Sequence, residues 1–177
     1  SEHVVALLKQ MYGENRVEEN AARYQLVADG FAKEFGDKAF EFFSAPGRTE
    51  IGGNHTDHNH GKVLAGSVHL DCVAAAAPNG THTVNLISET YNQHLEIDLD
   101  DLAPTEKTTG TEPLLKGICA GLLEKGCKVE GFDAYVTSNV IGGAGVSSSA
   151  SFEMLVCVIV DHLFNEGKID VVTYAKA

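Results

Sequence analysis

The stretch SNVIGGAGVSSSASFEML, residues 138–155, decides the fold that this sequence predicts. An apolar segment at 132–140 is expected to form a strand before it, and an apolar helix is expected at 150–165. Gly142, Gly143 and Gly145 allow positive φ angles and close approach of the backbone to a ligand. The serines that follow place hydroxyls at a helix N-terminus, where free N–H groups and the helix dipole attract an anion. The pattern therefore predicts a strand, a phosphate-binding loop and a helix.

This loop matches neither of two common nucleotide motifs. No lysine follows the glycines, as a P-loop requires, and no third glycine follows Gly143 and Gly145 at the spacing of a dinucleotide fingerprint. A serine hydroxyl here is also suited to Mg²⁺, which prefers oxygen ligands. The alternative is a plain serine N-cap after a tight turn, which needs one serine and one glycine and not three of each.

The rest of the chain predicts a single α+β unit, a mixed sheet packed by helices. Helices are expected at 3–12, 20–36, about 113–125 and from 170 to the end, and a loop at 102–112. Strands are expected at 39–45, where Pro46-Gly47 ends the pattern, at 63–77 as one or two buried strands, at 83–88 and at 94–99. Because the last helical pattern is still running at residue 177, we expect the chain to be a piece of a longer protein.

The amino-acid composition limits the kinds of molecule that this chain is expected to bind. The chain has 177 residues, with 13 Lys and Arg against 25 Asp and Glu, and a formal net charge of −12. Such a chain is a poor candidate for nucleic-acid or anionic-membrane binding. Its four cysteines, Cys72, Cys119, Cys127 and Cys157, form no C-x-x-C pair and are expected to be free buried thiols. With no signal peptide and no apolar stretch long enough to span a bilayer, a cytoplasmic location is expected.

A second motif, APGRTEIGGNHTDHNHG at 45–61, combines charged and imidazole side chains with glycines. In one interpretation Asp57 and its neighbours accept hydrogen bonds from sugar hydroxyls while Arg48 stabilises a phosphate in transfer. In a second, His55, His58, His60 and Asp57 form a zinc or iron site. A third interpretation is a solvated polar loop.

Together the two motifs resemble those of the galactokinases, in the GHMP superfamily of small-molecule kinases. The first family motif has Gly-Arg, a hydrophobic-Gly pair, Glu-His-Thr-Asp, an aromatic residue and Asn, here GRTEIGGNHTDHNHG at 47–61. The second has Pro-x-Gly-x-Gly-Leu-Ser-Ser-Ser-Ala, here IGGAGVSSSAS at 141–151. The resemblance implies that residues 1–177 form the N-terminal domain of such a kinase, with a fold like domain 2 of ribosomal protein S5. It implies that a C-terminal domain is absent from this chain.

On the sugar side, the resemblance implies that Arg48 steadies the charge of the transition state. The implied sugar-binding positions are Asn54, His55, Thr56 and Asp57. The family glutamate is replaced by Asn54, the aromatic residue by His58 and the loop proline by Ile141, and Glu50 stands where the family has asparagine. The glutamate carboxylate would accept a hydrogen bond from a sugar hydroxyl, and its replacement changes which sugar the site selects. The expected substrate is therefore galactose or a related sugar.

On the nucleotide side, the resemblance implies that ATP and Mg²⁺ are bound, with Ser149 as a magnesium ligand. The implied nucleotide-binding positions are Ser88, Gly143, Ala144, Gly145, Val146, Ser147, Ser148 and Ser149. Ser88 is also suited to a plain turn at the end of its strand. The family's general base and a further magnesium ligand lie beyond residue 177, so no base is assigned here.

The predicted function is that of an ATP-dependent kinase acting on the anomeric hydroxyl of galactose or a related sugar, with the chain alone inactive. Its partners would be the sugar and MgATP. One alternative is a sensor of the galactokinase type that binds sugar and nucleotide without turnover. A second is a metal-dependent hydrolase that uses the histidine cluster.

Overall fold

The computed structural model describes residues 2–52, 64–103, 110–140 and 148–170. Within these residues, five strands form one mixed sheet in the order β1-β2-β5-β3-β4. The strands are β1 (Glu41–Gly52), β2 (Leu64–Pro78), β3 (Thr83–Ser88), β4 (Gln93–Asp98) and β5 (Phe132–Ser138). Neighbouring strands pair antiparallel except β3 and β5, which are parallel. The predicted α+β fold with a mixed sheet is therefore confirmed.

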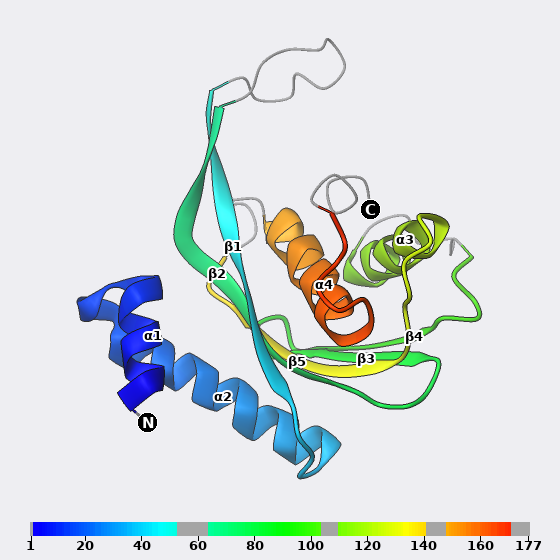
Figure 1. Ribbon diagram of the computed structural model, residues 1–177, viewed down its shortest axis with the longest axis horizontal. Coiled ribbons are helices and arrows are strands. Elements are labelled where there is room, and N and C mark those ends of the chain that lie inside the picture. The colour runs from blue at the N-terminus through cyan, green and yellow to red at the C-terminus, as the bar shows by residue number, and fades with distance from the viewer. Residues whose placement is uncertain (1, 53–63, 104–109, 141–147, 171–177) are drawn as a thin grey trace.

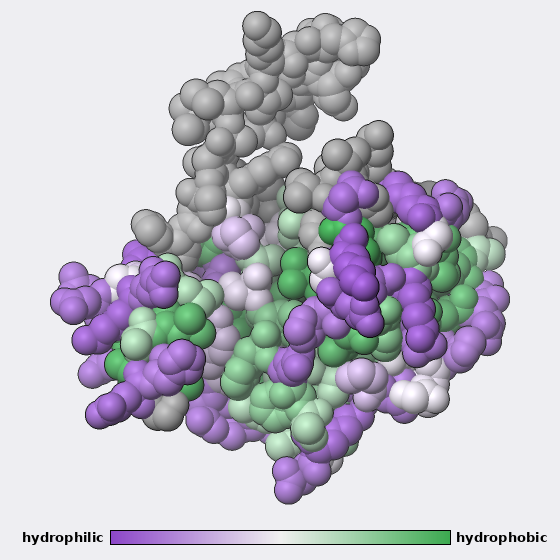
Figure 2. Space-filling view, viewed as in Figure 1, coloured by the Kyte–Doolittle hydropathy of each residue, from purple (hydrophilic) through white to green (hydrophobic). Residues whose placement is uncertain are grey.

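Helices cover both faces of this sheet (Figure 1). On one side lie α1 (Glu2–Tyr12), the short 3-10 helix η1 (Glu14–Arg16) and α2 (Val17–Phe35). On the other side lie α3 (Thr111–Glu124) and α4 (Ser148–Phe164). Hydrophobic residues are gathered between these layers, and hydrophilic ones cover much of the outer surface (Figure 2). The helix α1 also exposes large apolar side chains, namely Val4, Val5, Leu7 and Met11. None of the helices in the described part of the chain is long and apolar enough to cross a membrane.

The internal strand β2 is buried on both faces from Asp71 to Ala77, so its side chains supply two cores. Val73, Ala75 and Ala77 pack with Val27 and Phe31 of α2. The alternate side chains belong to the larger core under α3 and α4; they are Cys72, Ala74 and Ala76. This alternation follows from the two-residue period of a strand, and the alanines allow helices to approach closely on both sides.

Most predicted elements are confirmed within a few residues, but the predicted end of the first strand is wrong. Instead of ending at Pro46-Gly47, β1 continues to Gly52, with a register shift between Pro46 and Arg48. The structure supplies the reason, because β1 is an edge strand of the described sheet, where the missing N–H of a proline need not cost a ladder hydrogen bond. The predicted terminal helix, from 171 onward, lies outside the described residues.

The cysteines are free thiols, as predicted, although Cys127 is half-buried while the other three are buried. Burial raises the pKa of the Cys119 thiol to about 12 and that of Cys157 to about 11. Both therefore stay protonated at neutral pH. They behave as small apolar side chains of the core and are not nucleophiles.

A buried carboxylate connects α2 to the sheet at one end of β2. Asp133 of β5, 6% exposed, accepts hydrogen bonds from Lys38 Nζ at 2.6 Å and from Asn79 and Asn85 at 3.0 Å each. Burial alone would raise the pKa of Asp133, but these three donors and the Lys38 charge outweigh it and lower the pKa below 3.8. The ionised form is therefore favoured in the folded protein.

We expect Asp133→Asn to destabilise the protein at neutral pH by about 1–3 kcal/mol, because it removes the charge that these donors stabilise. Since the folded-state pKa is lowered, this stability is present above pH 3.8 and is lost as the pH falls through the folded value. Denaturant unfolding at several pH values measures the difference. A difference between wild type and variant that did not shrink on acidification would contradict the assignment.

Candidate functional site

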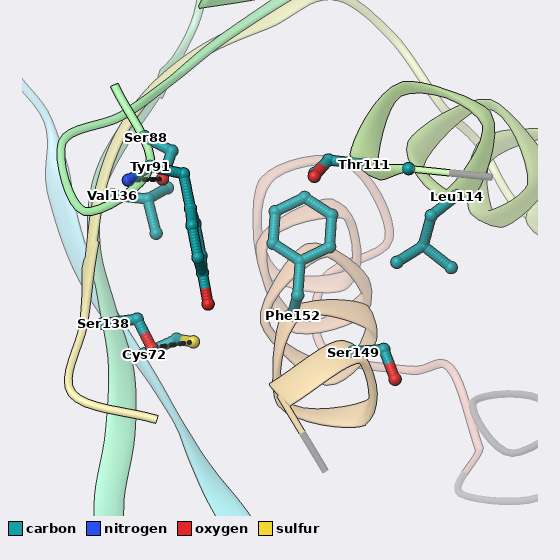
Figure 3. A pocket seen from close by; sticks show the side chains of 10 residues that line it. Cys72, Ser88, Tyr91, Thr111, Leu114, Val136, Ser138, Ser149 and Phe152 are labelled. Atoms are coloured by element: carbon teal, nitrogen blue, oxygen red, sulfur yellow. Dashed lines mark hydrogen bonds between the residues drawn. The ribbon is translucent and has the colours of Figure 1, made fainter. Parts of the chain in front are cut away.

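A cavity of about 310 Å³ lies between the sheet and the helices α3 and α4. It is lined by residues of five elements and two connections, namely Cys72, Ser88, Tyr91, Gly110, Thr111, Leu114, Val136, Ser138, Ser149 and Phe152. Figure 3 shows the Tyr91 ring on one wall and the Phe152 ring on the wall formed by α4. Apolar walls with hydroxyl groups among them are typical of sites for small organic ligands.

Two helices begin at this cavity. Gly110 and Thr111, at the start of α3, contribute to its lining, and so does Ser149 in the first turn of α4. The N-cap residue of α3, Gly110, has a φ of 117° and makes no capping hydrogen bond through a side chain. Because first-turn N–H groups and the helix dipole favour negative charge, both ends are suited to a phosphorylated ligand.

Hydrogen bonds hold the turn that carries Tyr91 against β5. Thr137 Oγ1 donates to Glu89 Oε2 at 3.0 Å, and the Ser138 N–H donates to Thr90 Oγ1 at 2.8 Å. The Tyr91 N–H donates to Ser88 Oγ at 3.4 Å, so Ser88 both lines the cavity and closes the turn. The two sequence interpretations of Ser88 are therefore compatible. Tyr91, 50% exposed, forms an aromatic wall of the cavity that is open to solvent.

Ser151 connects the first turns of α4 to the strands of the sheet. The residue is 1% exposed, and its hydroxyl lies 2.9 Å from the carbonyl oxygen of Ala45, to which it donates, and 3.3 Å from Cys72 Sγ. Cys72 in turn lies 3.1 Å from Ser138 Oγ. The start of α4 is thus placed against β1, β2 and β5 at the edge of the cavity.

The structure brings two of the predicted nucleotide-binding residues together. It places by the backbone one further nucleotide-binding residue, Ser148, and the predicted catalytic residue Arg48. Ser88 and Ser149 line the same cavity, although Ser88 comes from β3 and Ser149 from α4. Ser148 begins α4, and the backbone of Arg48 pairs with Ser67 of β2. The binding roles of these residues stay predictions.

The other predicted site residues lie outside the described part of the chain. On the sugar side they are Asn54, His55, Thr56 and Asp57. In the phosphate motif they are Gly143, Ala144, Gly145, Val146 and Ser147. The histidine cluster of the metal interpretation also falls there, and no group of three or more metal-ligating side chains is found among the described residues.

Comparison with known proteins gives a consistent result. A family model described as the galactokinase galactose-binding signature matches residues 29–78. The galactokinase of Clostridium tetani is 33% identical over 146 residues, which are 82% of this chain and 37% of that protein. The galactokinase of Lactococcus lactis is 35% identical over 155 residues, 84% of this chain and 38% of that protein. This chain is a relative of the galactokinases.

Solved structures agree with this relationship. The crystal structure of Lactococcus lactis galactokinase complexed with galactose matches with a TM-score of 0.75 at 33% identity, over 86% of this chain and 40% of that one. Methanococcus jannaschii mevalonate kinase matches with a TM-score of 0.64 at 15% identity, over 79% of this chain and 45% of that one, which shows a shared fold. This galactokinase relative thus spans less than half the length of the proteins it matches.

Sequence reasoning missed the apolar walls of the cavity. Tyr91, Leu114 and Phe152 come from three separate segments, and nothing local in the sequence connects them. Two weak signals were available. One is an aromatic residue in the polar turn after the strand at 83–88, and the other is an aromatic residue three positions after the serine run.

Proposed function

We propose that the complete protein transfers the γ-phosphoryl group of ATP to the anomeric hydroxyl of galactose or a related sugar. The observation that carries the proposal is the cavity in which Ser88 and Ser149, both expected at the nucleotide, are brought together. Identity of 33–35% to galactokinases over most of this chain supports the same reaction class. We further propose that residues 1–177 form one domain, and that a second domain completes the enzyme.

The cavity fits a nucleotide by the chemistry of its walls. Its aromatic and aliphatic side chains are suited to a planar base, and the starts of α3 and α4 are suited to phosphates. We assign Ser88, Ser148 and Ser149 to the nucleotide, together with the loop 143–147. Ser149, which is exposed, carries a hydroxyl oxygen suited to Mg²⁺, a cation that supplies charge neutralisation in phosphoryl transfer.

In the reaction, the anomeric hydroxyl oxygen forms the new bond to the γ-phosphorus, and the bond from that phosphorus to the β,γ-bridging oxygen breaks. ADP leaves with the electron pair of that bond. Arg48 would stabilise the charge that develops on the transferring group, and residues 54–57 would hold the sugar hydroxyls. The hydroxyl proton passes to a base that we do not assign within this chain. Catalysis of this kind depends mainly on positioning and charge stabilisation.

The direct test incubates the complete protein, as its gene encodes it, with MgATP and galactose. Formation of a sugar 1-phosphate and ADP, followed by ³¹P NMR, is the expected result. Tight binding of both ligands without turnover would instead support the sensor alternative, which the replacement of the family glutamate by Asn54 motivates. A stoichiometric zinc ion that is lost in His58→Ala would support the hydrolase alternative. The predicted cytoplasmic location stays a prediction.

Arg48→Ala tests the assigned charge stabilisation. Removing one donor to a developing anion typically costs on the order of a hundredfold in turnover number, so we expect a loss of about that size. Steady-state kinetics on the complete protein measure it. A kcat within about threefold of wild type would show that Arg48 has no such role, because a transition-state donor contributes far more.

Tyr91→Ala tests the nucleotide assignment of the cavity. Stacking of a base on an aromatic side chain contributes about 1–3 kcal/mol, so we expect roughly tenfold weaker binding of an ATP analogue that cannot transfer its phosphoryl group. Tyr91→Phe keeps the ring and is the matched control, with affinity close to wild type. Calorimetric titration gives both constants. Equal affinities for wild type and Tyr91→Ala would remove this cavity from the nucleotide site.

A further inference from the structure

Asp71 lies where β2 leaves the sheet. From Cys72 to Pro78, β2 pairs with β5 on one side, and up to Ala76 it also pairs with β1 on the other. Toward Leu64, the described pairing of β2 is with β1 alone. Residues 46–52 and 64–71 therefore form a two-stranded extension, the β1–β2 ribbon, which projects beyond the helix layers (Figure 1).

The ladder of this ribbon is irregular at its base. Pro46 pairs with Asp71, but the next pair is Arg48 with Ser67, so two residues of β1 advance against four of β2. Such irregularities bend a strand and increase its local twist, and an isolated two-stranded ribbon is at best marginally stable. The direction of the ribbon that carries Arg48 therefore has to be fixed by contacts other than its own ladder.

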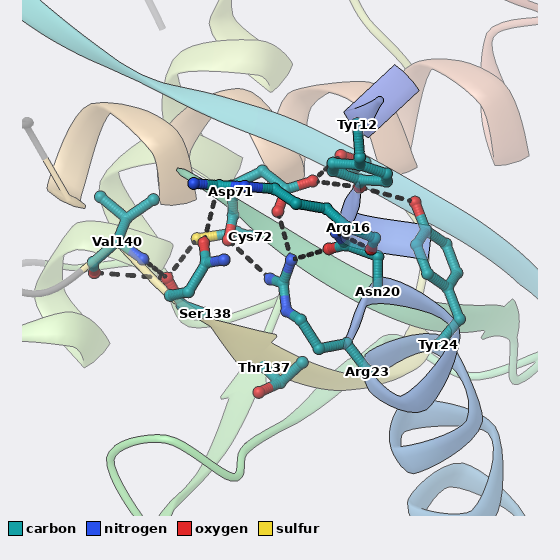
Figure 4. Close-up of polar contacts among 12 residues, drawn as sticks. Tyr12, Arg16, Asn20, Arg23, Tyr24, Asp71, Cys72, Thr137, Ser138 and Val140 are labelled. Carbon is teal, nitrogen blue, oxygen red and sulfur yellow. Dashed lines mark hydrogen bonds and ion pairs between the residues drawn. The ribbon is translucent and has the colours of Figure 1, made fainter. Parts of the chain in front are cut away.

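The Asp71 side chain supplies contacts of this kind. It is 4% exposed, and its carboxylate accepts hydrogen bonds from Tyr12 of α1, from Arg23 of α2 at 2.5 Å and from Ser44 of β1 at 2.6 Å (Figure 4). Arg23 Nη2 also donates to the Asp71 carbonyl oxygen at 2.8 Å, and its Nη1 to Asn20 Oδ1 at 3.0 Å. One residue thus joins the base of the ribbon to both helices of the α1–α2 layer.

The backbone of Asp71 is fixed from a third direction. Its N–H donates to Asn139 Oδ1 at 2.7 Å, and the Asn139 N–H donates to its carbonyl oxygen at 3.2 Å. Asn139 directly follows β5 and stands two residues before the phosphate motif at 141–151. Asp71 therefore connects the strand that carries one motif to the strand that leads into the other.

A buried ion pair is an expensive way to gain stability alone, because desolvation offsets most of its attraction and apolar residues often serve as well. Hydrogen bonds to a charged group also fix the direction in which its partners lie. We propose that Asp71 is a positioning residue, which with Tyr12, Arg23 and Asn139 fixes the β1–β2 ribbon relative to the strand that enters the phosphate motif. Its consequence for catalysis rests on the proposed function, but its consequence for the ribbon does not.

Asp133 offers a matched control. It is also a buried carboxylate on the central part of the sheet and accepts from a cation, Lys38, at 2.6 Å, but it pairs opposite Ala77, at the far end of β2 from Asp71. Backbone hydrogen–deuterium exchange is compared in the complete protein for wild type, Asp71→Asn and Asp133→Asn. We expect Asp71→Asn to speed exchange in peptides covering 46–52 and 64–71 about tenfold more than Asp133→Asn does, as local opening requires.

Uniform acceleration across the sheet in Asp71→Asn, or equal ribbon exchange in the two variants, would overturn the proposal. If Asp71→Asn does not fold, Tyr12→Phe decides the question. It keeps the ring of Tyr12 and removes one donor to the carboxylate, so the same peptides should exchange faster by a smaller factor. Unchanged exchange of those peptides in folded Tyr12→Phe would equally overturn it.

Kinetics give the second readout. A displaced ribbon should lower kcat about tenfold or more and raise the KM for the sugar, with the KM for ATP nearly unchanged, because small misplacements of reacting groups are costly. Asp133→Asn should lower the melting temperature without this split. An Asp71→Asn protein that is merely less stable, with wild-type kinetics below its melting temperature, would show a structural role only. If wild type lacked phosphorylation, the proposed function would fail while the exchange experiment still tested the ribbon.

Discussion

The arrangement of the whole molecule depends on one strand being buried on both faces. From Asp71 to Ala77, every residue of β2 is at most 4% exposed. Odd-numbered side chains meet α2 and even-numbered ones meet the core under α3 and α4. Small side chains are what make this possible, because alanines at 74–77 leave room for a helix layer on each side. Moving β2 by one residue would exchange its faces, so the register of both neighbours follows from this strand.

Near each end of this buried run lies a carboxylate, and the two differ in what they connect. Asp133 accepts from Lys38, Asn79 and Asn85, which lie after α2, in the turn after β2 and in β3, respectively. Asp71 accepts from α1, α2 and β1 and is joined through its backbone to Asn139. The first set closes one end of the sheet. The second determines how the helix layer, the ribbon and the exit of β5 are placed relative to one another.

Much of the fold was predictable because many of its helices and strands follow from the local spacing of apolar residues. The helices from 17 and 111 and the strands β3 and β5 follow apolar spacings that a short window contains. The strand expected to end at Pro46 shows the limit of such reasoning. Proline ends a central strand but is tolerated at an edge, and which strand lies at the edge depends on the whole sheet.

The candidate site was predictable where a motif carries it and not where tertiary structure assembles it. The glycine and serine run indicated Ser149, and the family resemblance indicated Ser88. The aromatic wall and the Asp71 contacts were missed because their parts are distant in sequence. Arg23 and Asn139 are separated from Asp71 by 48 and 68 residues. One signal was present, a single carboxylate in the apolar run LDCVAAAA at 70–77, since a buried charge needs partners that the fold must bring to it.

Apolar packing and hydrogen bonds to charged groups have different roles in this molecule. Apolar packing between β2 and the helices is non-directional, so it holds the layers together while tolerating small displacements. The proposed phosphoryl transfer would tolerate such displacements poorly, because the acceleration of such a reaction comes from the alignment of the attacking oxygen, the phosphorus and the charges around them. A guanidinium that contacts both the carboxylate and the carbonyl oxygen of one residue leaves little freedom of angle. Directional contacts of this kind are therefore needed most at the base of the ribbon, where the paired backbone alone does not fix a direction.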